Sequence, residues 1–240
     1  MVVIVAALLS TVATVLKPLQ DANEEMAKKS DILSSIGIET EDVEGRYAQV
    51  IKDEWVVRNG EIVESDVSPI DILMEMKKRT AMANTEREVP LFRAEHEGNT
   101  YYILPMQGKG LWGPIWGFVS LEADGNTVYG ATYGHKSETP GLGAEIATPI
   151  FQDQYPGKIL FSDSYDGIEV RKGDASGDQQ VDGISGGTIT SVAVQYMFED
   201  CLVPYKGFLM NLSQVEETPA EDVAVEEAPQ VEDVENTNAQ

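Results

Sequence analysis

The chain has 240 residues, with 41 Asp and Glu against 17 Lys and Arg, so its formal net charge at pH 7 is −24. This acidic balance excludes nucleic acid as a partner, because a phosphate backbone binds to basic surfaces. One cysteine and two histidines exclude a disulfide scaffold and a metal centre rich in thiolate or imidazole ligands. Hydrophobic residues make up 42% of the chain, and we expect one main domain with extensions.

The first predicted element is a membrane anchor over residues 1–17. Residues 1–16 carry no charge, glycine or proline. A helix of that length reaches about 24 Å, less than the roughly 30 Å hydrocarbon core, so we expect a single-pass span that starts further upstream. A buried helix is an alternative. A signal-peptide core is another, but no basic residue precedes the segment and no A-x-A site follows it before Lys17-Pro18.

A polar, helix-prone connector is predicted over residues 18–40, with Lys17-Pro18 marking the exit from the membrane. The pair Lys28-Lys29 would favour a cytoplasmic flank, because positive residues after a span are retained on that side. Two residues are a weak topogenic signal, so charge alone leaves the orientation open.

Residues 41–213 are predicted to form an α+β domain, with an antiparallel sheet and flanking helices. Asp124-Gly125-Asn126 is typical of a hairpin turn between two of the strands. Tyr165-Asp166-Gly167 is expected to link a further strand pair. The predicted strands are 101–105, 114–121, 127–133, 158–163 and 168–172, with a glycine-rich turn at 108–110 and helices at 71–82 and 191–201.

Residues 214–240 are predicted to be a disordered acidic tail. They contain nine acidic residues and no Lys or Arg. Such a segment cannot bury enough apolar surface to offset the entropy of ordering it.

The common catalytic motifs are absent from the sequence, which has no G-x-S-x-G, no Walker loop and no H-E-x-x-H. The G-x-G-x-x-G pattern at residues 108–113 lies between two predicted strands and does not open a helix, so it does not indicate a dinucleotide fold. We therefore predict no catalytic residue and no metal site.

One segment that could bind a ligand is 182–191, DGISGGTITS, which leads into the last predicted helix. Its glycines allow close backbone approach, and the free N–H groups of a helix start bind phosphate. The alternative is a plain helix cap made by Ser or Thr.

A second segment, 135–145 (HKSETPGLGAE), is a rigid turn whose backbone could read a planar polar ring, with Leu142 against the face of that ring. A tight loop between strands is the alternative. Residues 108–112 (GKGLW) could add a wall, with an aromatic face on Trp112. His135 is expected to be a structural hydrogen bonder.

These motifs together resemble the FMN-binding domain family. S-G-G-T at 185–188 is similar to the flavinylation motif of that family, which usually has alanine where Gly187 stands. The runs GKGLWGPIWG at 108–117 and HKSETPGLGAE at 135–145 also look like the family. The likeness is greatest to the flavin-carrying subunit of sodium-translocating NADH:quinone reductases.

The resemblance implies that Thr188 carries FMN through a phosphoester, attached by a separate flavin transferase that works with FAD and a divalent metal. The expected FMN-binding residues are Thr188, Ser185, Gly186, Gly187, Lys109, Leu111, Trp112, Glu138, Thr139, Gly141, Leu142 and Gly143. The protein would pass electrons between the other subunits of a complex in the bacterial inner membrane, with its soluble domain in the periplasm.

Two other functions stay open at this point. One is the G subunit of a ferredoxin:NAD (Rnf-type) electron-transport complex, which shares the motif and differs in its partners. The other is a membrane-anchored assembly or binding domain without a cofactor, in which the glycine turn only caps a helix.

Overall fold

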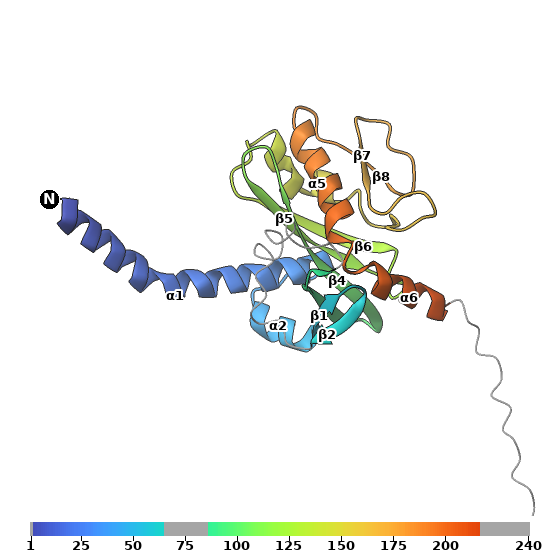
Figure 1. Cartoon of the computed structure of the whole chain (residues 1–240), viewed down its shortest axis with the longest axis horizontal. Coiled ribbons are helices and arrows are strands. Elements are labelled where there is room, and N and C mark those ends of the chain that lie inside the picture. Colours follow the sequence, from blue (N-terminus) through green and yellow to red (C-terminus); the bar gives the residue numbers. More distant parts are fainter. Residues whose placement is uncertain (1, 65–85, 217–240) are drawn as a thin grey trace, which may run out of the picture.

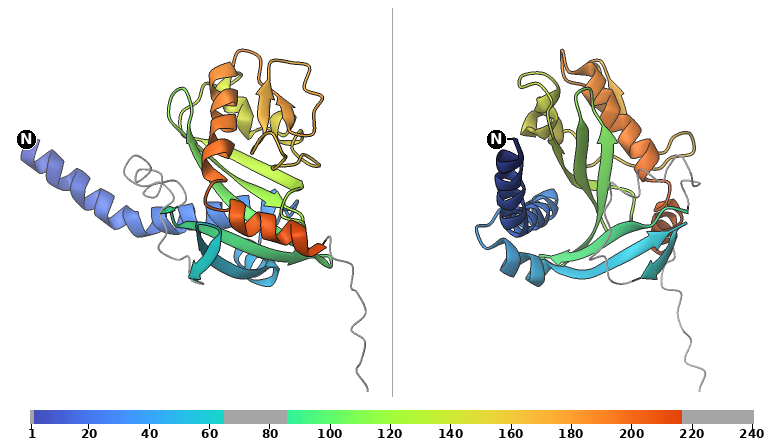
Figure 2. Two further views of the ribbon diagram at one scale, coloured as in Figure 1. Left: turned by 45° about the vertical axis from the view of Figure 1, so that its right-hand side comes forward. Right: turned by 60° about the vertical axis from the view of Figure 1, so that its left-hand side comes forward.

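The computed structural model describes residues 2–64 and 86–216. Its main element is a six-stranded antiparallel sheet in the order β2-β1-β3-β4-β5-β6 (Figures 1 and 2). The predicted α+β class with an antiparallel sheet is therefore confirmed. The strands are β1 Ile51–Arg58, β2 Glu61–Glu64, β3 Val89–His96, β4 Asn99–Lys109, β5 Pro114–Leu121 and β6 Val128–His135.

Tight turns join neighbouring strands of this sheet. The link from β1 to β2 is Asn59-Gly60, with φ of 51° and 78°, and the link from β3 to β4 is Glu97-Gly98, with φ of 53° and 83°. Two consecutive residues with positive φ match the right-handed twist of a hairpin. The sheet order therefore follows largely from local turns.

The N-terminal helix α1, Val2–Ser35, is continuous over 34 residues with Pro18 inside it. The predicted anchor and most of the predicted connector are thus one helix, and Lys17-Pro18 does not end it. A proline inside a helix removes a hydrogen bond and bends the axis, and α1 changes direction along its length (Figure 1). Among the described residues, α1 alone is long and apolar enough to cross a membrane, and none of its apolar window is buried.

The end of α1 and helix α2 (Val43–Val50) cover one face of the sheet. Ile32 and Leu33 are buried there against Phe92, Ile103 and Phe118. The backbone carbonyl of Ser35 accepts a hydrogen bond from the Ser120 hydroxyl at 2.5 Å. A Cβ at Gly130 would collide with the same carbonyl, so α1 reaches the strands this closely because residue 130 is glycine.

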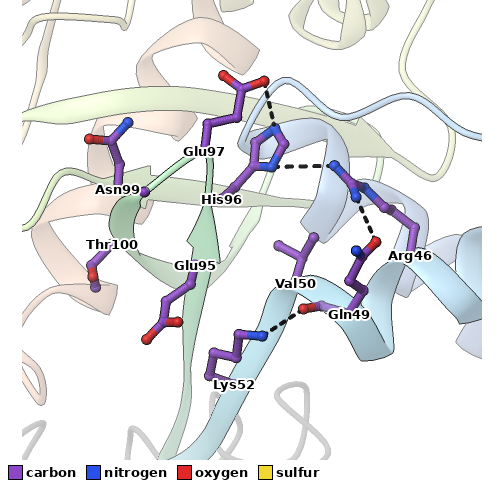
Figure 3. A pocket seen from close by; sticks show the side chains of 10 residues that line it. Arg46, Gln49, Val50, Lys52, Glu95, His96, Glu97, Asn99 and Thr100 are labelled. Atoms are coloured by element: carbon purple, nitrogen blue, oxygen red, sulfur yellow. Dashed lines mark hydrogen bonds and ion pairs between the residues drawn. The ribbon is translucent and has the colours of Figure 1, made fainter.

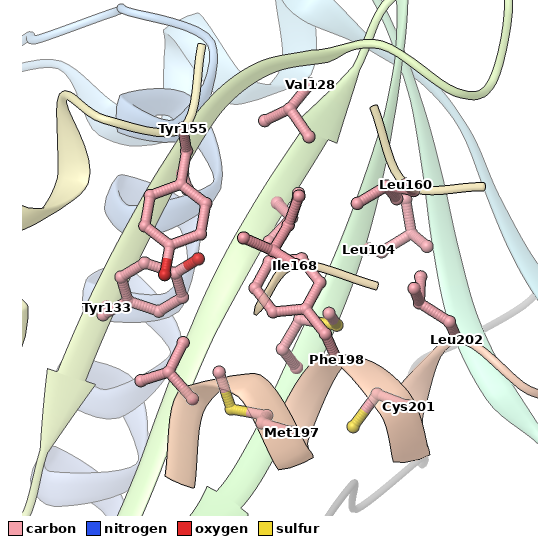
Figure 4. Close-up of a cluster of buried hydrophobic side chains, with 14 of the residues drawn as sticks. Leu104, Val128, Tyr133, Tyr155, Leu160, Ile168, Met197, Phe198, Cys201 and Leu202 are labelled. Carbon is pink, nitrogen blue, oxygen red and sulfur yellow. The ribbon is translucent and has the colours of Figure 1, made fainter. Parts of the chain in front are cut away.

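The opposite face of the sheet is covered by helix α5 (Thr188–Cys201), the 3-10 helix η2 (Gly143–Ala147) and the short helix α4 (Pro149–Gln152). Phe198 of α5 stacks on Tyr155, with ring centroids 5.8 Å apart. Leu104, Tyr133 and Met197 complete the centre of this core (Figure 4). The sheet thus separates a core facing α1 from a core facing α5.

The predicted strand pair 158–163 with 168–172 is wrong. Among the described residues, 158–163 makes two isolated bridges, Ile159 with Thr127 and Phe161 with Asp166, and neither reaches 168–172. Strand β7 (Glu169–Arg171) instead pairs in parallel with β8 (Gln180–Asp182). The side-chain amide of Gln179 donates to three carbonyls of the 160–167 loop at 2.9–3.0 Å and so takes the place of strand pairing.

Helix boundaries also differ from the predictions. Helix α5 begins at Thr188 instead of residue 191, because Gly187 already acts as its N-cap. Helix α6 (Lys206–Glu216) continues past the predicted domain end at 213. The predicted helix 71–82 and the tail beyond residue 216 lie outside the described residues.

We predict that Phe198→Ala lowers the free energy of unfolding by about 3–5 kcal/mol, because it leaves a cavity against Tyr155 in a close-packed core. Urea denaturation followed by near-UV circular dichroism measures this change. Tyr196→Ala, on the same helix but 60% exposed, should cost less than about 1 kcal/mol. Equal losses for the two variants would contradict this view of the core.

Candidate functional site

The start of helix α5 has no side-chain cap. Its N-cap is Gly187, and no described side chain caps its first turn. That turn also contains no acidic residue. The free N–H groups and the positive end of the helix dipole therefore face outward beside Thr188, whose side chain is exposed.

The turn that leads into α5 is held by backbone and side-chain hydrogen bonds. The Ser191 hydroxyl accepts from the N–H of Ile184 and donates to the carbonyl of Gly187, each at 3.0 Å. Gly186 has a φ of 77°, a conformation that glycine adopts without strain. Thr188 is thus presented by a defined turn.

A cavity of about 540 Å³ lies beside Thr188. Ser185 and Gly186 line it from the turn, and Arg171 and Lys172 line it from the end of β7. Hydrogen bonding to Arg171 lowers the pKa of the Glu169 carboxyl, which keeps that side chain charged and paired with Arg171 at 2.9 Å. The charged residues that line the cavity are thus Arg171, which is paired with Glu169, together with Lys172 and Asp182.

The sequence predictions did not include Arg171 and Lys172. Both were placed on a strand of a local hairpin, whereas β7 pairs with β8 and so comes to lie next to residues 182–186. The signal that could have found them is a pair of cations followed by Gly173 in an otherwise acidic chain.

Leu142 lies directly against the glycine turn. A Cβ at Gly186 would be 2.7 Å from the Cδ2 atom of Leu142, and a Cβ at Gly187 would be 3.0 Å from its carbonyl oxygen. Leu142 is still 41% exposed. The structure therefore brings the first two predicted segments together, with an apolar side chain at their contact.

Glu138 joins all three predicted segments. Its Oε1 atom accepts from the backbone N–H of Trp112 at 2.8 Å, and its Oε2 atom accepts from the Thr190 hydroxyl at 2.6 Å. Its own N–H donates to Nδ1 of His135 at 3.2 Å, the structural role expected for that histidine. Glu138 is only 4% exposed, so both carboxylate oxygens are engaged inside the protein.

The tip of the β4–β5 hairpin forms an apolar edge of the site. The N–H of Gly110 donates to the carbonyl of Gly113 at 2.8 Å and closes the tip, so the turn lies at 110–113 instead of 108–110. Leu111 and Trp112 are 48% and 65% exposed. Lys109 ends β4 opposite Pro114, and its side chain is exposed.

The remaining predicted residues shape the 138–143 loop. The carbonyl of Thr139 accepts from the N–H groups of Leu142 and Ala144, each at 3.1 Å. Gly141 has a φ of 75°, and its N–H donates to the Glu145 carboxylate at 2.8 Å. Gly143 is buried beside Glu138.

A larger hollow of about 730 Å³ lies at the opposite end of β4, around Arg46 and His96 (Figure 3). The Arg46 guanidinium already donates to Gln49 at 2.7 Å and lies 3.3 Å from Nδ1 of His96. Because β4 is 11 residues long, this hollow is roughly 30 Å from the glycine turn and does not belong to the site. No group of three or more metal-ligating side chains occurs among the described residues.

The class of protein follows from a family match: this α+β domain is an FMN-binding domain. The FMN-binding domain family matches residues 110–203, which include Glu138, Arg171 and Thr188.

Relatives over most of the chain are more specific. The C subunit of Na(+)-translocating NADH-quinone reductase from Vibrio alginolyticus is 35% identical, covering 87% of this chain and 88% of that protein. The same subunit from Haemophilus ducreyi is 36% identical, covering 80% and 82%. The crystal structure of its counterpart from Parabacteroides distasonis is 38% identical, with a TM-score of 0.72, and covers 81% and 96%. The chain belongs to the family formed by the C subunit of Na(+)-translocating NADH-quinone reductase, which disfavours the ferredoxin:NAD alternative.

We predict that Gly143→Ala disrupts the bridge made by Glu138. The added Cβ would stand 2.5 Å from both the Glu138 Oε2 atom and the Thr190 hydroxyl oxygen. We expect the free energy of unfolding to fall by about 2–3 kcal/mol, measured by urea denaturation. Gly157→Ala, with a φ of 79° and no neighbour within 4 Å, measures backbone strain alone and should cost less. If Gly143→Ala lowers the free energy of unfolding less than Gly157→Ala does, the added Cβ at residue 143 is not crowded by Glu138 and Thr190.

Proposed function

We propose that this chain is the electron-transfer subunit of a Na+-translocating NADH-quinone reductase complex and carries FMN on Thr188 through a phosphoester. The observation that carries the proposal is an exposed hydroxyl at an uncapped helix start, beside a cavity with two cations. The names of the relatives support the complex and the other subunits as partners.

The residues present fit an FMN phosphate. The free N–H groups at the start of α5 would donate hydrogen bonds to the phosphate oxygens, and Arg171 and Lys172 would balance their charge. A cavity of about 540 Å³ falls within the usual range for cofactor sites. Leu142, Leu111 and Trp112 supply exposed apolar and aromatic surface at the same end of the domain.

Attachment requires another enzyme. A threonine hydroxyl is a weak nucleophile without a base, and no described side chain holds the Thr188 hydroxyl as a hydrogen-bonded base would. A flavin transferase that uses FAD and a divalent metal would make the bond, with Thr188 as its substrate: the Thr188 oxygen would bond to the FMN phosphorus, the pyrophosphate bond of FAD would break, and AMP and the hydroxyl proton would leave. A covalent tether keeps the cofactor at very high local concentration, so that it is not lost in either redox state.

Bound FMN would supply the redox chemistry, and the protein would hold and tune it. The roles left to this chain are to fix the phosphate at α5, to present the flavin beside Leu142 and Trp112, and to limit access of water on that side. No side chain needs to act as an acid or base.

Helix α1 supports a single-pass anchor for this subunit, because its apolar part is exposed and projects away from the domain (Figure 2). The membrane would be the bacterial inner membrane, with the domain on the periplasmic side.

We predict that Thr188→Ala abolishes covalent flavin when the chain is produced together with a flavin transferase, because the acceptor oxygen is gone. In-gel fluorescence after denaturing electrophoresis and intact-protein mass spectrometry measure the loss. Ser164→Ala, which removes an exposed hydroxyl on another loop, should keep full labelling. A fluorescent Thr188→Ala band would disprove the assignment of the acceptor, and an unlabelled wild-type chain would disprove covalent attachment.

We predict that protease added to spheroplasts degrades the domain, whereas inverted membrane vesicles protect it, because a domain in the periplasm faces outward only in spheroplasts. Immunoblotting against the domain measures the fragments, and a cytoplasmic protein serves as the leakage control. Protection in spheroplasts would place the domain on the cytoplasmic side.

A further inference from the structure

The Glu138 carboxylate has features of a positioning residue for flavin attachment, an idea that rests on the proposed function. Both of its oxygens accept hydrogen bonds from other segments, and its side chain is only 4% exposed. This role is an alternative to the predicted contact with the flavin, which stays a prediction.

The Oε2 atom of Glu138 fixes the start of helix α5. Thr190 is the third residue of α5, only two positions after Thr188, and is 1% exposed. A helix turn moves as a unit, so fixing the Thr190 hydroxyl at 2.6 Å also fixes where Thr188 stands. A hydrogen bond to a charged group is stronger than a neutral one, which makes this a firm attachment.

The Oε1 atom of Glu138 fixes the hairpin tip that carries Trp112. The Trp112 N–H donates to Glu138 at 2.8 Å from the tip of the β4–β5 hairpin, whose side chains point into solvent. Gly110 and Gly143 permit this approach, because a Cβ at either position would lie 2.6 Å or 2.5 Å from a Glu138 oxygen. One buried carboxylate thus sets the distance between the attachment point and the exposed indole.

We infer that Glu138, through Thr190 and the Trp112 loop, pre-positions Thr188 relative to the aromatic wall, so that FMN is transferred quickly and then held with little motion. Glu138 touches neither Thr188 nor the flavin in this scheme. It acts by removing the freedom of two segments that would otherwise have to be ordered during transfer.

The test uses the full-length chain in detergent, with a flavin transferase, FAD and Mg²⁺. The substitution Thr190→Val keeps the shape of the side chain and removes the donor. We expect the initial rate of FMN incorporation, measured by intact mass, to fall roughly tenfold. We also expect the fluorescence anisotropy of the attached flavin to fall, because the flavin is held less rigidly. Thr190→Ser keeps the hydroxyl and should restore the rate to within about twofold.

Two further variants separate positioning from stability. Thr132→Val removes a hydroxyl that donates to the Asp31 carbonyl at 3.3 Å under α1, and it should leave both the rate and the anisotropy unchanged. Glu138→Gln keeps the Trp112 hydrogen bond through its amide oxygen and can donate to the Thr190 oxygen, so it should stay closer to wild type than Thr190→Val.

The inference is overturned if Thr190→Val matches wild type in rate and anisotropy, or if Thr132→Val slows incorporation as much as Thr190→Val does. A wild-type chain that gains no FMN under the same conditions would overturn the proposed function, and this inference with it. A normal wild-type rate with an unaffected Thr190→Val variant would overturn the inference alone.

Discussion

The site end of this domain is organised by the burial of one carboxylate. A charged group in the interior is very costly unless hydrogen bonds and nearby charges compensate it. Glu138 accepts hydrogen bonds from a backbone N–H of the β4–β5 hairpin and from a hydroxyl of α5. Because those donors come from segments 26 and 52 residues away in the chain, satisfying the carboxylate also assembles the site.

The other face of the sheet connects the domain to the apolar N-terminal helix. Helix α1 begins with an exposed apolar part. Its end packs against the strands, where Ile32 and Leu33 are buried. The Ser35 carbonyl is fixed by Ser120, and Gly130 lets the helix lie close. The apolar N-terminal segment and the domain are therefore joined by one continuous helix, whose end packs against the sheet.

Much of the fold could be predicted from local patterns. The strands near 101–105, 114–121 and 127–133 were identified because alternation and the Asp124-Gly125-Asn126 turn are local signals. The pairing of β7 failed because a three-residue strand carries no information about its partner, which lies about ten residues further on and runs parallel. The sequence predicted helical structure on both sides of Pro18, and the structure joins the two parts into one helix that is buried only near its end, at Ile32, Leu33 and Ser35.

The chemistry available to this protein can be read from its residues alone: a threonine after a glycine turn, an apolar N-terminal segment, and motifs typical of one flavoprotein family. Those features are local, so they are visible without knowledge of the fold. The three-dimensional arrangement was needed to show that Glu138 is a buried bridge, that Arg171 and Lys172 flank the cavity, and that Leu142 lies on the glycine turn. These contacts join segments far apart in the chain, and which of them meet depends on how both faces of the sheet are covered.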